Sequence, residues 1–320
     1  MAAPEMQQSI IDDTETLVAD AALTIDRQLQ AVAQSLDEIV SHTAATVRQI
    51  HRLRISTRRA TATLNLYQDW LPAKERLWMR SSLRRIRRAA GEARDMDVLL
   101  KRYARKNRRR QRKVFAADCK RERRRAVRRL SRVGKQIVRT GKYTRRQNKL
   151  VSAFRTSLIT ALQIRTGRRE NWQETVQNFL RRSHEPTDSL KSLHRLRVKA
   201  KGVRYVLELV DIADIQPQRK DALEVLGEIQ KQLGTVNDHE VARRFFKLCR
   251  KRTSDAKDRK TLKGLIQRER RKRDDAIADF RKWWCPAALE SFRAVLVEMI
   301  DWDEMPGAVV VDREVLRVVT

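Results

Sequence analysis

Two stretches of this chain share one pattern: Val47-Arg48-Gln49-Ile50-His51-Arg52-Leu53-Arg54-Ile55-Ser56-Thr57-Arg58-Arg59 and, 143 residues later, Leu190-Lys191-Ser192-Leu193-His194-Arg195-Leu196-Arg197-Val198-Lys199-Ala200-Lys201-Gly202. A second match follows at the same offset, where Leu83, Ile86, Arg88, Gly91, Asp95, Asp97 and Val98 correspond to Leu226, Ile229, Lys231, Gly234, Asp238, Glu240 and Val241. Two separate matches at one offset indicate a duplicated unit.

Each copy predicts a helix with a cationic stripe beside an apolar one. At about 100° per residue, the histidine and the cations three and seven residues after it share one narrow face, next to a row of Leu, Val and Ala. That distance is about 10 Å of helix, which suits several consecutive phosphates better than one small anion. Arg binds phosphate oxygens through a planar fork, and Lys acts as a point charge. The candidate binding residues are Arg48, His51, Arg54 and Arg58, and in the second copy Lys191, His194, Arg197, Lys201 and Arg204.

A basic helix face is most often only solvated, and a single copy would favour that interpretation. Because both copies keep the histidine and the cations at one spacing, we favour ligand binding. Further candidates lie at the second match: Arg88, Arg94 and Lys231. Asp95 and Asp238 are predicted to cap helices that begin after a glycine. Alternatively, these carboxylates orient a nearby Arg or His by ion pairing.

The composition favours an all-α protein with a polyanionic partner. Aromatic residues make up 5% of the 320-residue chain, hydrophobic residues 41%, and 9 Gly and 6 Pro give few breaks. There are 72 Lys and Arg against 40 Asp and Glu, for a net charge of +32 and a pI near 11.1. Such a charge attracts phosphate polymers, nucleic acids or anionic membranes without specificity.

The spacing predicts helices in the same order in each half. In the first half they lie at about 10–41, 44–70 and 73–90, the last ending near Gly91, followed by a very basic helix at 101–146 that breaks near Gly134 and Gly141. In the second half they lie at about 149–166, 172–182, 189–213 and 218–233, followed by a basic stretch at 243–273 and a helix at 287–300. We therefore expect two four-helix bundles, at 10–140 and 145–300, and a tail at 301–320.

The cysteines and the hydropathy bound the location. Cys119, Cys249 and Cys285 are scattered and odd in number, so we expect no disulfide framework and no zinc site, as suits a reducing cytoplasm. The first 20 residues are acidic without a long apolar run, and no stretch of 18 apolar residues occurs. We expect no signal peptide and no membrane span.

The repeated motif resembles the conserved histidine α-helical domain, the CHAD family, over about residues 20–300. The family pattern HxxRhxxK/R, where h is apolar, matches His51-Arg54-Ile55-Arg58 and His194-Arg197-Val198-Lys201, and the second match continues into Arg204-Tyr205. Further similarity lies in Gly91-Glu92-Ala93-Arg94-Asp95-Met96-Asp97-Val98. The resemblance implies two four-helix bundles related by a pseudo-twofold axis, with a basic, pore-like surface between them that binds inorganic polyphosphate. Thr61 stands where the second half has Arg204, so the first stripe is one cation shorter.

Three functions fit the sequence. Binding of polyphosphate without catalysis is favoured, with cytoplasmic location or association with a polyphosphate or storage granule. Catalysis is disfavoured because no P-loop is present and few carboxylates lie near the motifs to hold a metal; we expect no catalytic residue, metal or cofactor. General polyanion binding, with weak binding of nucleic acid, is the alternative, although stacking aromatics are sparse in the basic stretches.

Overall fold

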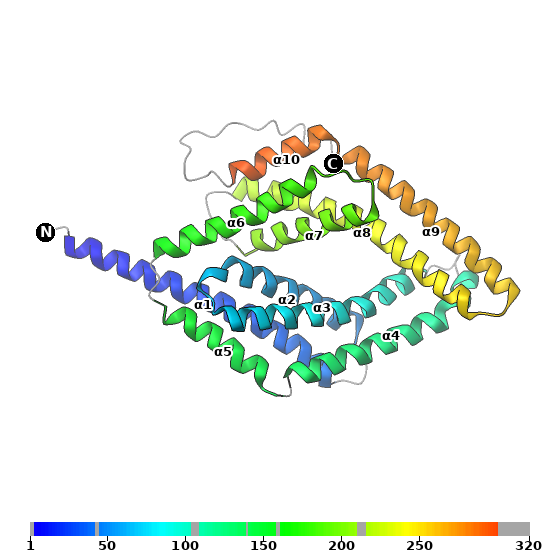
Figure 1. The fold of residues 1–320 in the computed structure, drawn as a ribbon, viewed down its shortest axis with the longest axis horizontal. Coiled ribbons are helices and arrows are strands. Elements are labelled where there is room, and N and C mark those ends of the chain that lie inside the picture. The colour runs from blue at the N-terminus through cyan, green and yellow to red at the C-terminus, as the bar shows by residue number, and fades with distance from the viewer. Residues whose placement is uncertain are drawn as a thin grey trace. The chain divides into compact units, whose positions relative to one another are not determined.

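Helices form nearly all of the described part of the chain, which comprises residues 3–41, 45–103, 109–138, 140–157, 161–209 and 216–299. In this computed structural model the protein is all-α, with no β-strand in those ranges (Figure 1). A short 3₁₀ helix, η1, spans Gln68–Trp70. The α-helices are α1 (Ala3–Ser41), α2 (Val47–Leu66), α3 (Ala73–Arg102), α4 (Arg109–Val138), α5 (Lys142–Arg155), α6 (Ala161–Ser183), α7 (Leu190–Leu207), α8 (Gln216–Arg252), α9 (Ala256–Trp283) and α10 (Pro286–Glu298).

The helix boundaries repeat at the offset of the sequence matches. α2 and α7 begin 143 residues apart, and so do α3 and α8. Thr46 and Ser189 stand at the N-caps of α2 and α7, and each forms a capping box with the residue three positions later. The described helices thus follow one another as five and five, one more per half than expected. The additional helix of the first half, α5, begins after Gly141, whose φ of +59° interrupts the helical path.

Two predicted helix ends are wrong. α3 continues through Gly91 and Asp95, and α8 continues through Gly234 and Asp238, so neither aspartate is an N-cap. A glycine inside a helix costs only about 1 kcal/mol, and apolar neighbours in the same turns are buried, among them Ala90 and Ala93 in α3 and Leu233 and Val236 in α8. Packing of these turns outweighs the low helix propensity of glycine.

Contacts divide the chain into two units at other positions than the expected bundles. Unit 1 comprises residues 1–97 and 120–171, and unit 2 comprises 98–119 and 172–320. Each of α3, α4 and α6 therefore contributes residues to both units. The predicted tail at 301–320 and His42 lie outside the described residues.

Unit 1 is built on α1, which packs against α2 and α5. Tyr143 of α5 is buried and its hydroxyl donates a hydrogen bond to the carbonyl of Leu29 at 2.9 Å. Gly134 of α4 lies so close to α1 that an added Cβ would stand 2.7 Å from a methyl carbon of Val40. These contacts fix α4 and α5 against the long first helix.

Unit 2 is built on α8, which packs against α7, α9 and α10. An aromatic cluster joins Tyr103, Phe115 and Phe246, with ring centroids 4.9–5.6 Å apart. Tyr103 follows the end of α3 and Phe115 belongs to α4, so segments distant in sequence from α8 complete this core.

Candidate anion-binding sites

The first predicted stripe is assembled on α2 with a contribution from α3. His51 is exposed, and its pKa is lowered first by partial burial and then by the charges of Arg94, Arg54 and Arg58. The structure therefore brings four predicted residues together, which we name the His51 cluster: His51, Arg54, Arg58 and Arg94. An imidazole among three cations takes up a proton unfavourably, and a bound anion would reverse that effect.

Arg54 is positioned by the glycine that was expected to end α3. Its Nη1 atom donates a long hydrogen bond of 3.5 Å to the carbonyl oxygen of Arg87. An added Cβ at Gly91 would lie 2.9 Å from the same nitrogen. Gly91 thus leaves the space through which the half-buried Arg54 side chain passes beside α3.

The second stripe forms a similar cluster on α7 and α8. His194 is exposed, and its pKa is lowered first by partial burial and then by Arg197, Lys201 and Arg244. We name these four residues the His194 cluster. Arg244 was not among the predicted residues, because its place beside α7 depends on α8 continuing through Gly234. The signal available in the sequence was Lys101, the cation that stands 143 residues earlier.

A buried carboxylate holds Arg244 in place. Glu240 accepts hydrogen bonds from Arg243 at 2.8 Å, from Arg244 at 2.9 Å and from Arg273 at 2.7 Å. Burial alone would raise the pKa of Glu240, but the hydrogen bonds from these arginines outweigh it and lower the pKa to about 2. Glu240 therefore stays ionised and fixes three guanidinium groups on α8 and α9.

Asp238 acts on the same cluster from within α8. Burial raises its pKa, and the charges of Arg197 and Arg102 oppose that rise. Asp238 is thus close enough to Arg197 to attract it, which agrees with the alternative that this aspartate orients a nearby arginine.

The comparisons with known proteins agree on one family. The sequence profile of the CHAD domain matches residues 25–247, more than half of the chain. The chain belongs to the CHAD-domain family. Among solved structures, the CHAD domain from the plant Ricinus communis is similar, with a TM-score of 0.62, 20% identity, and coverage of 88% of this chain and 91% of that chain. PptA from Streptomyces chartreusis has a TM-score of 0.57 and 16% identity, and the match covers 85% of this chain and 99% of that chain. A search of curated proteins finds no match.

The CHAD match contains both histidine clusters and ends before α9. Beyond it, α9 contributes Glu269, a carboxylate that is 1% exposed in a polar network of unit 2. Glu269 accepts a hydrogen bond from the hydroxyl of Tyr103 at 2.6 Å and lies 2.7 Å from Nδ1 of His239. If Nδ1 donates to Glu269, the other ring nitrogen accepts from Arg102, which contacts both nitrogens. Burial, followed by the hydrogen bond to Glu269, raises the pKa of Tyr103 to about 12.

The remaining predicted residues stand outside the two clusters. Arg48 and Lys191 are exposed about one turn before the histidines, and Arg88 is exposed on α3. Arg204 pairs with Glu208 at 3.2 Å on its own helix. Lys231 pairs with Glu228 at 2.9 Å, and its side chain is 77% exposed. Neither Arg88 nor Lys231 is among the main charges that act on the histidines.

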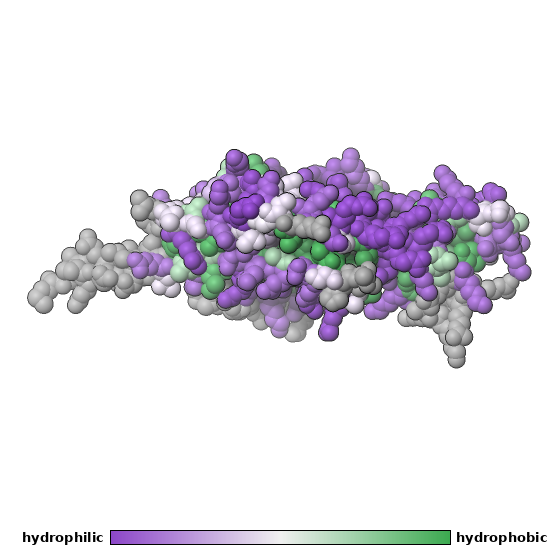
Figure 2. Space-filling view, turned by 90° about the horizontal axis from the view of Figure 1, so that it is seen from below, coloured by the Kyte–Doolittle hydropathy of each residue, from purple (hydrophilic) through white to green (hydrophobic). Residues whose placement is uncertain are grey.

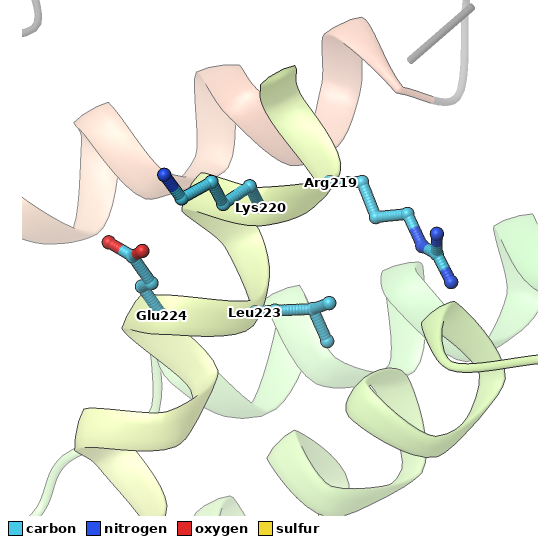
Figure 3. Close-up of a pocket in the computed structure, with 4 residues that line it drawn as sticks. All are labelled: Arg219, Lys220, Leu223 and Glu224. Atoms are coloured by element: carbon cyan, nitrogen blue, oxygen red, sulfur yellow. The ribbon is translucent and has the colours of Figure 1, made fainter. Parts of the chain in front are cut away.

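A shallow pocket lies on the first turns of α8, away from these assignments. Arg219, Lys220, Leu223 and Glu224 line it, and none of the four is a predicted binding residue (Figure 3). Arg219 also donates from Nε to the carbonyl oxygen of Leu207 at 3.0 Å, which ties α8 to the end of α7. The opening lies beside one helix and has no counterpart among the cation clusters.

Two searches of the described residues concern other kinds of site. No group of three or more His, Cys, Asp or Glu side chains is placed to hold a metal ion within those ranges. No helix in the described part of the chain combines the length and apolar character that crossing a membrane requires.

Proposed function

We propose that the His51 and His194 clusters bind inorganic polyphosphate. The observation that carries the proposal is the electrostatic environment of the two histidines: the charges that act most on each are all positive. A polyanion placed there would neutralise the mutual repulsion of the cations and favour the protonated imidazole. Membership in the CHAD family supports this ligand, because the family resemblance implies polyphosphate binding.

The dimensions of the stripe favour a chain of phosphates over a single one. From Arg48 to Arg58, α2 advances by about 15 Å, at roughly 1.5 Å per residue. Arg54 and Arg58 lie on the same face as His51 and can contact successive phosphates by paired hydrogen bonds. The same spacing on α7 gives the polymer a second, separate place of contact.

Binding is proposed to occur without catalysis. Phosphoryl transfer relies on metal ions held by carboxylates near the phosphate, whereas the buried Glu240 beside the His194 cluster is engaged by three arginines. Incubation of the pure protein with polyphosphate, with and without EDTA, should release no phosphate above the rate of a buffer control. Release that EDTA abolishes would contradict this part of the proposal. Attachment to polyphosphate or storage granules remains a prediction.

The site is tested by competition binding at about 150 mM salt, where diffuse surface charge is substantially screened. Labelled long-chain polyphosphate is challenged with excess duplex DNA, RNA and ATP, and its retention is expected. The variant Arg54→Gln, Arg58→Gln should weaken binding, as should Arg197→Gln, Lys201→Gln. The matched control is Lys260→Gln, Lys263→Gln, which removes two exposed charges from α9. Equal weakening in the control would show that total charge, not the clusters, binds the polymer.

A further inference from the structure

A second cationic surface lies on α4, in unit 1. Arg124, Arg128, Arg132 and Lys135 are all exposed. Their spacing of four, four and three residues places them on one face of the helix. We name these four residues the α4 stripe. From first to last they cover about 16 Å of helix axis, at roughly 1.5 Å per residue.

The stripe differs from the other cations of α4 in having no anionic partner within the described residues. Arg123 pairs with Asp97 at 2.5 Å, Arg125 with Glu122 at 2.9 Å, and Arg129 with Glu92 at 2.5 Å. By contrast, none of the four stripe residues forms an ion pair with another residue in those ranges. Like charges four residues apart on a helix repel one another, so an external anion would relieve a cost that the fold itself leaves in place.

The opposite face of α4 is fixed against the rest of unit 1. Ala126, Leu130 and Ile137 are buried there, and Gly134 allows close approach to α1. The stripe therefore stands on a firmly packed helix and keeps its spacing when a ligand arrives. Figure 2 views the molecule from below Figure 1, the side of α4 and α5, and hydrophilic residues cover most of that view.

The duplicated half shows that the fold does not require this stripe. At the offset of 143, the α4 stripe corresponds to positions on α9 that are also exposed but carry mixed side chains: Gln267, Arg271, Asp275 and Ala278. A helix in the corresponding place of the chain thus folds with one cation, one anion and two neutral residues. The cations of α4 are a feature of the first half alone, which points to a use beyond solvation.

The shape and chemistry of the stripe fit a double-stranded nucleic acid. Binding to a membrane surface needs apolar side chains that enter the lipid, and binding of single strands relies on aromatic side chains that stack with bases. The stripe contains only Arg and Lys. Backbone phosphates of a duplex advance by about 3.4 Å per strand, so the stripe is about five base pairs long. We propose that the α4 stripe binds the phosphate backbone of duplex nucleic acid without reading its sequence.

The test is the salt dependence of duplex binding by the full-length protein. The triple variant Arg124→Gln, Arg128→Gln, Arg132→Gln is titrated with labelled 24-base-pair DNA and with labelled 24-base-pair RNA between 50 and 250 mM KCl. Loss of three phosphate contacts should reduce the slope of log K against log salt by about 2.7 for DNA. The two duplexes distinguish a preference for either nucleic acid. Because the substitutions remove repulsion, the variant should keep its helical circular dichroism and melting temperature.

The matched control is Lys257→Gln, Lys260→Gln, Lys263→Gln, which removes three exposed cations from α9. It should change the slope by less than half as much. An equal change in the control would overturn the proposal in favour of diffuse charge, and an unchanged slope in the α4 variant would overturn it outright. Loss of binding to phosphatidylserine vesicles with duplex binding intact would assign the stripe to membranes instead. Polyphosphate binding should persist in the α4 variant, so failure of this proposal can be told from failure of the function proposed for the clusters.

Discussion

Replacing Gly91 by Ala should separate stability from ligand binding, because this glycine is helical and lies against Arg54. Glycine in a helix interior is about 1 kcal/mol less favourable than alanine, so the substitution should strengthen α3. The new Cβ would stand 2.9 Å from Nη1 of Arg54. The guanidinium, at the end of a flexible side chain, must move and lose its 3.5 Å hydrogen bond to Arg87. We expect a net stability change between about 0 and 1 kcal/mol in favour of the variant.

The same change should weaken polyphosphate binding at the His51 cluster. Displacing Arg54 should cost about 1 kcal/mol of a charge-assisted contact, which is about a fivefold rise in Kd. The measurement is a fluorescence titration in a background that carries Arg197→Gln and Lys201→Gln, so that the His194 cluster does not mask the effect. Urea denaturation followed by circular dichroism reports the stability.

The duplication supplies the control, since Gly234 occupies the equivalent place in α8 and an added Cβ there would meet no atom within 4 Å. Gly234→Ala should be more stable by about 1 kcal/mol and should bind polyphosphate as the parent does. If Gly91→Ala and Gly234→Ala bind the polymer equally well, the place of Arg54 beside α3 does not matter for binding, and the reasoning fails.

Acid should strengthen polyphosphate binding, because the pKa values of His51 and His194 are held below 6.5 in the free protein by burial and neighbouring cations and a bound polyanion would raise them. Titrations from pH 8 to 5.5 should show Kd falling by at most about tenfold per pH unit per histidine, an effect absent from the double His→Gln variant; without ligand, the same lowered pKa values make stability fall as pH drops below about 6.5. Tyr103→Phe should destabilise the protein by about 1.5–3 kcal/mol, because the buried Glu269 carboxylate loses a 2.6 Å donor. The neutral counterpart, Tyr143→Phe, should cost only about 0.5–1.5 kcal/mol, and equal shifts of the two urea midpoints would contradict the role given to the charge of Glu269.

The sequence predicted the fold class and the stripes because both depend on local periodicity. α2 and α7 begin at the first residues of the two quoted stretches, at Val47 and Leu190, and their histidines are exposed as the spacing required. The first cluster also contains Arg94, which was predicted from the second match rather than from α2 itself. The cationic partners on one helix follow from its pitch alone.

Features that depend on tertiary packing were not predictable from the pattern. Gly91 was expected to end a helix, whereas it admits the side chain of Arg54. Arg244 joins His194 only because α8 continues without a break, and Glu240 holds it there. Single-sequence reasoning weighs the propensity of glycine but does not weigh the burial on either side of it.

The division of α3 and α4 between the units bears on how the chain is made. Residues 98–119 belong to unit 2, yet the partners of Tyr103 and Phe115 in that unit include Phe246 and Glu269, which are synthesised much later. During translation, the hairpin formed by the end of α3 and the start of α4 must wait with its aromatic side chains uncovered until α8 and α9 leave the ribosome. A nascent chain in that state is exposed to aggregation and to chaperones. A fragment that stops at Asn171 would remain in it permanently, so the protein should be produced as one chain rather than as two halves.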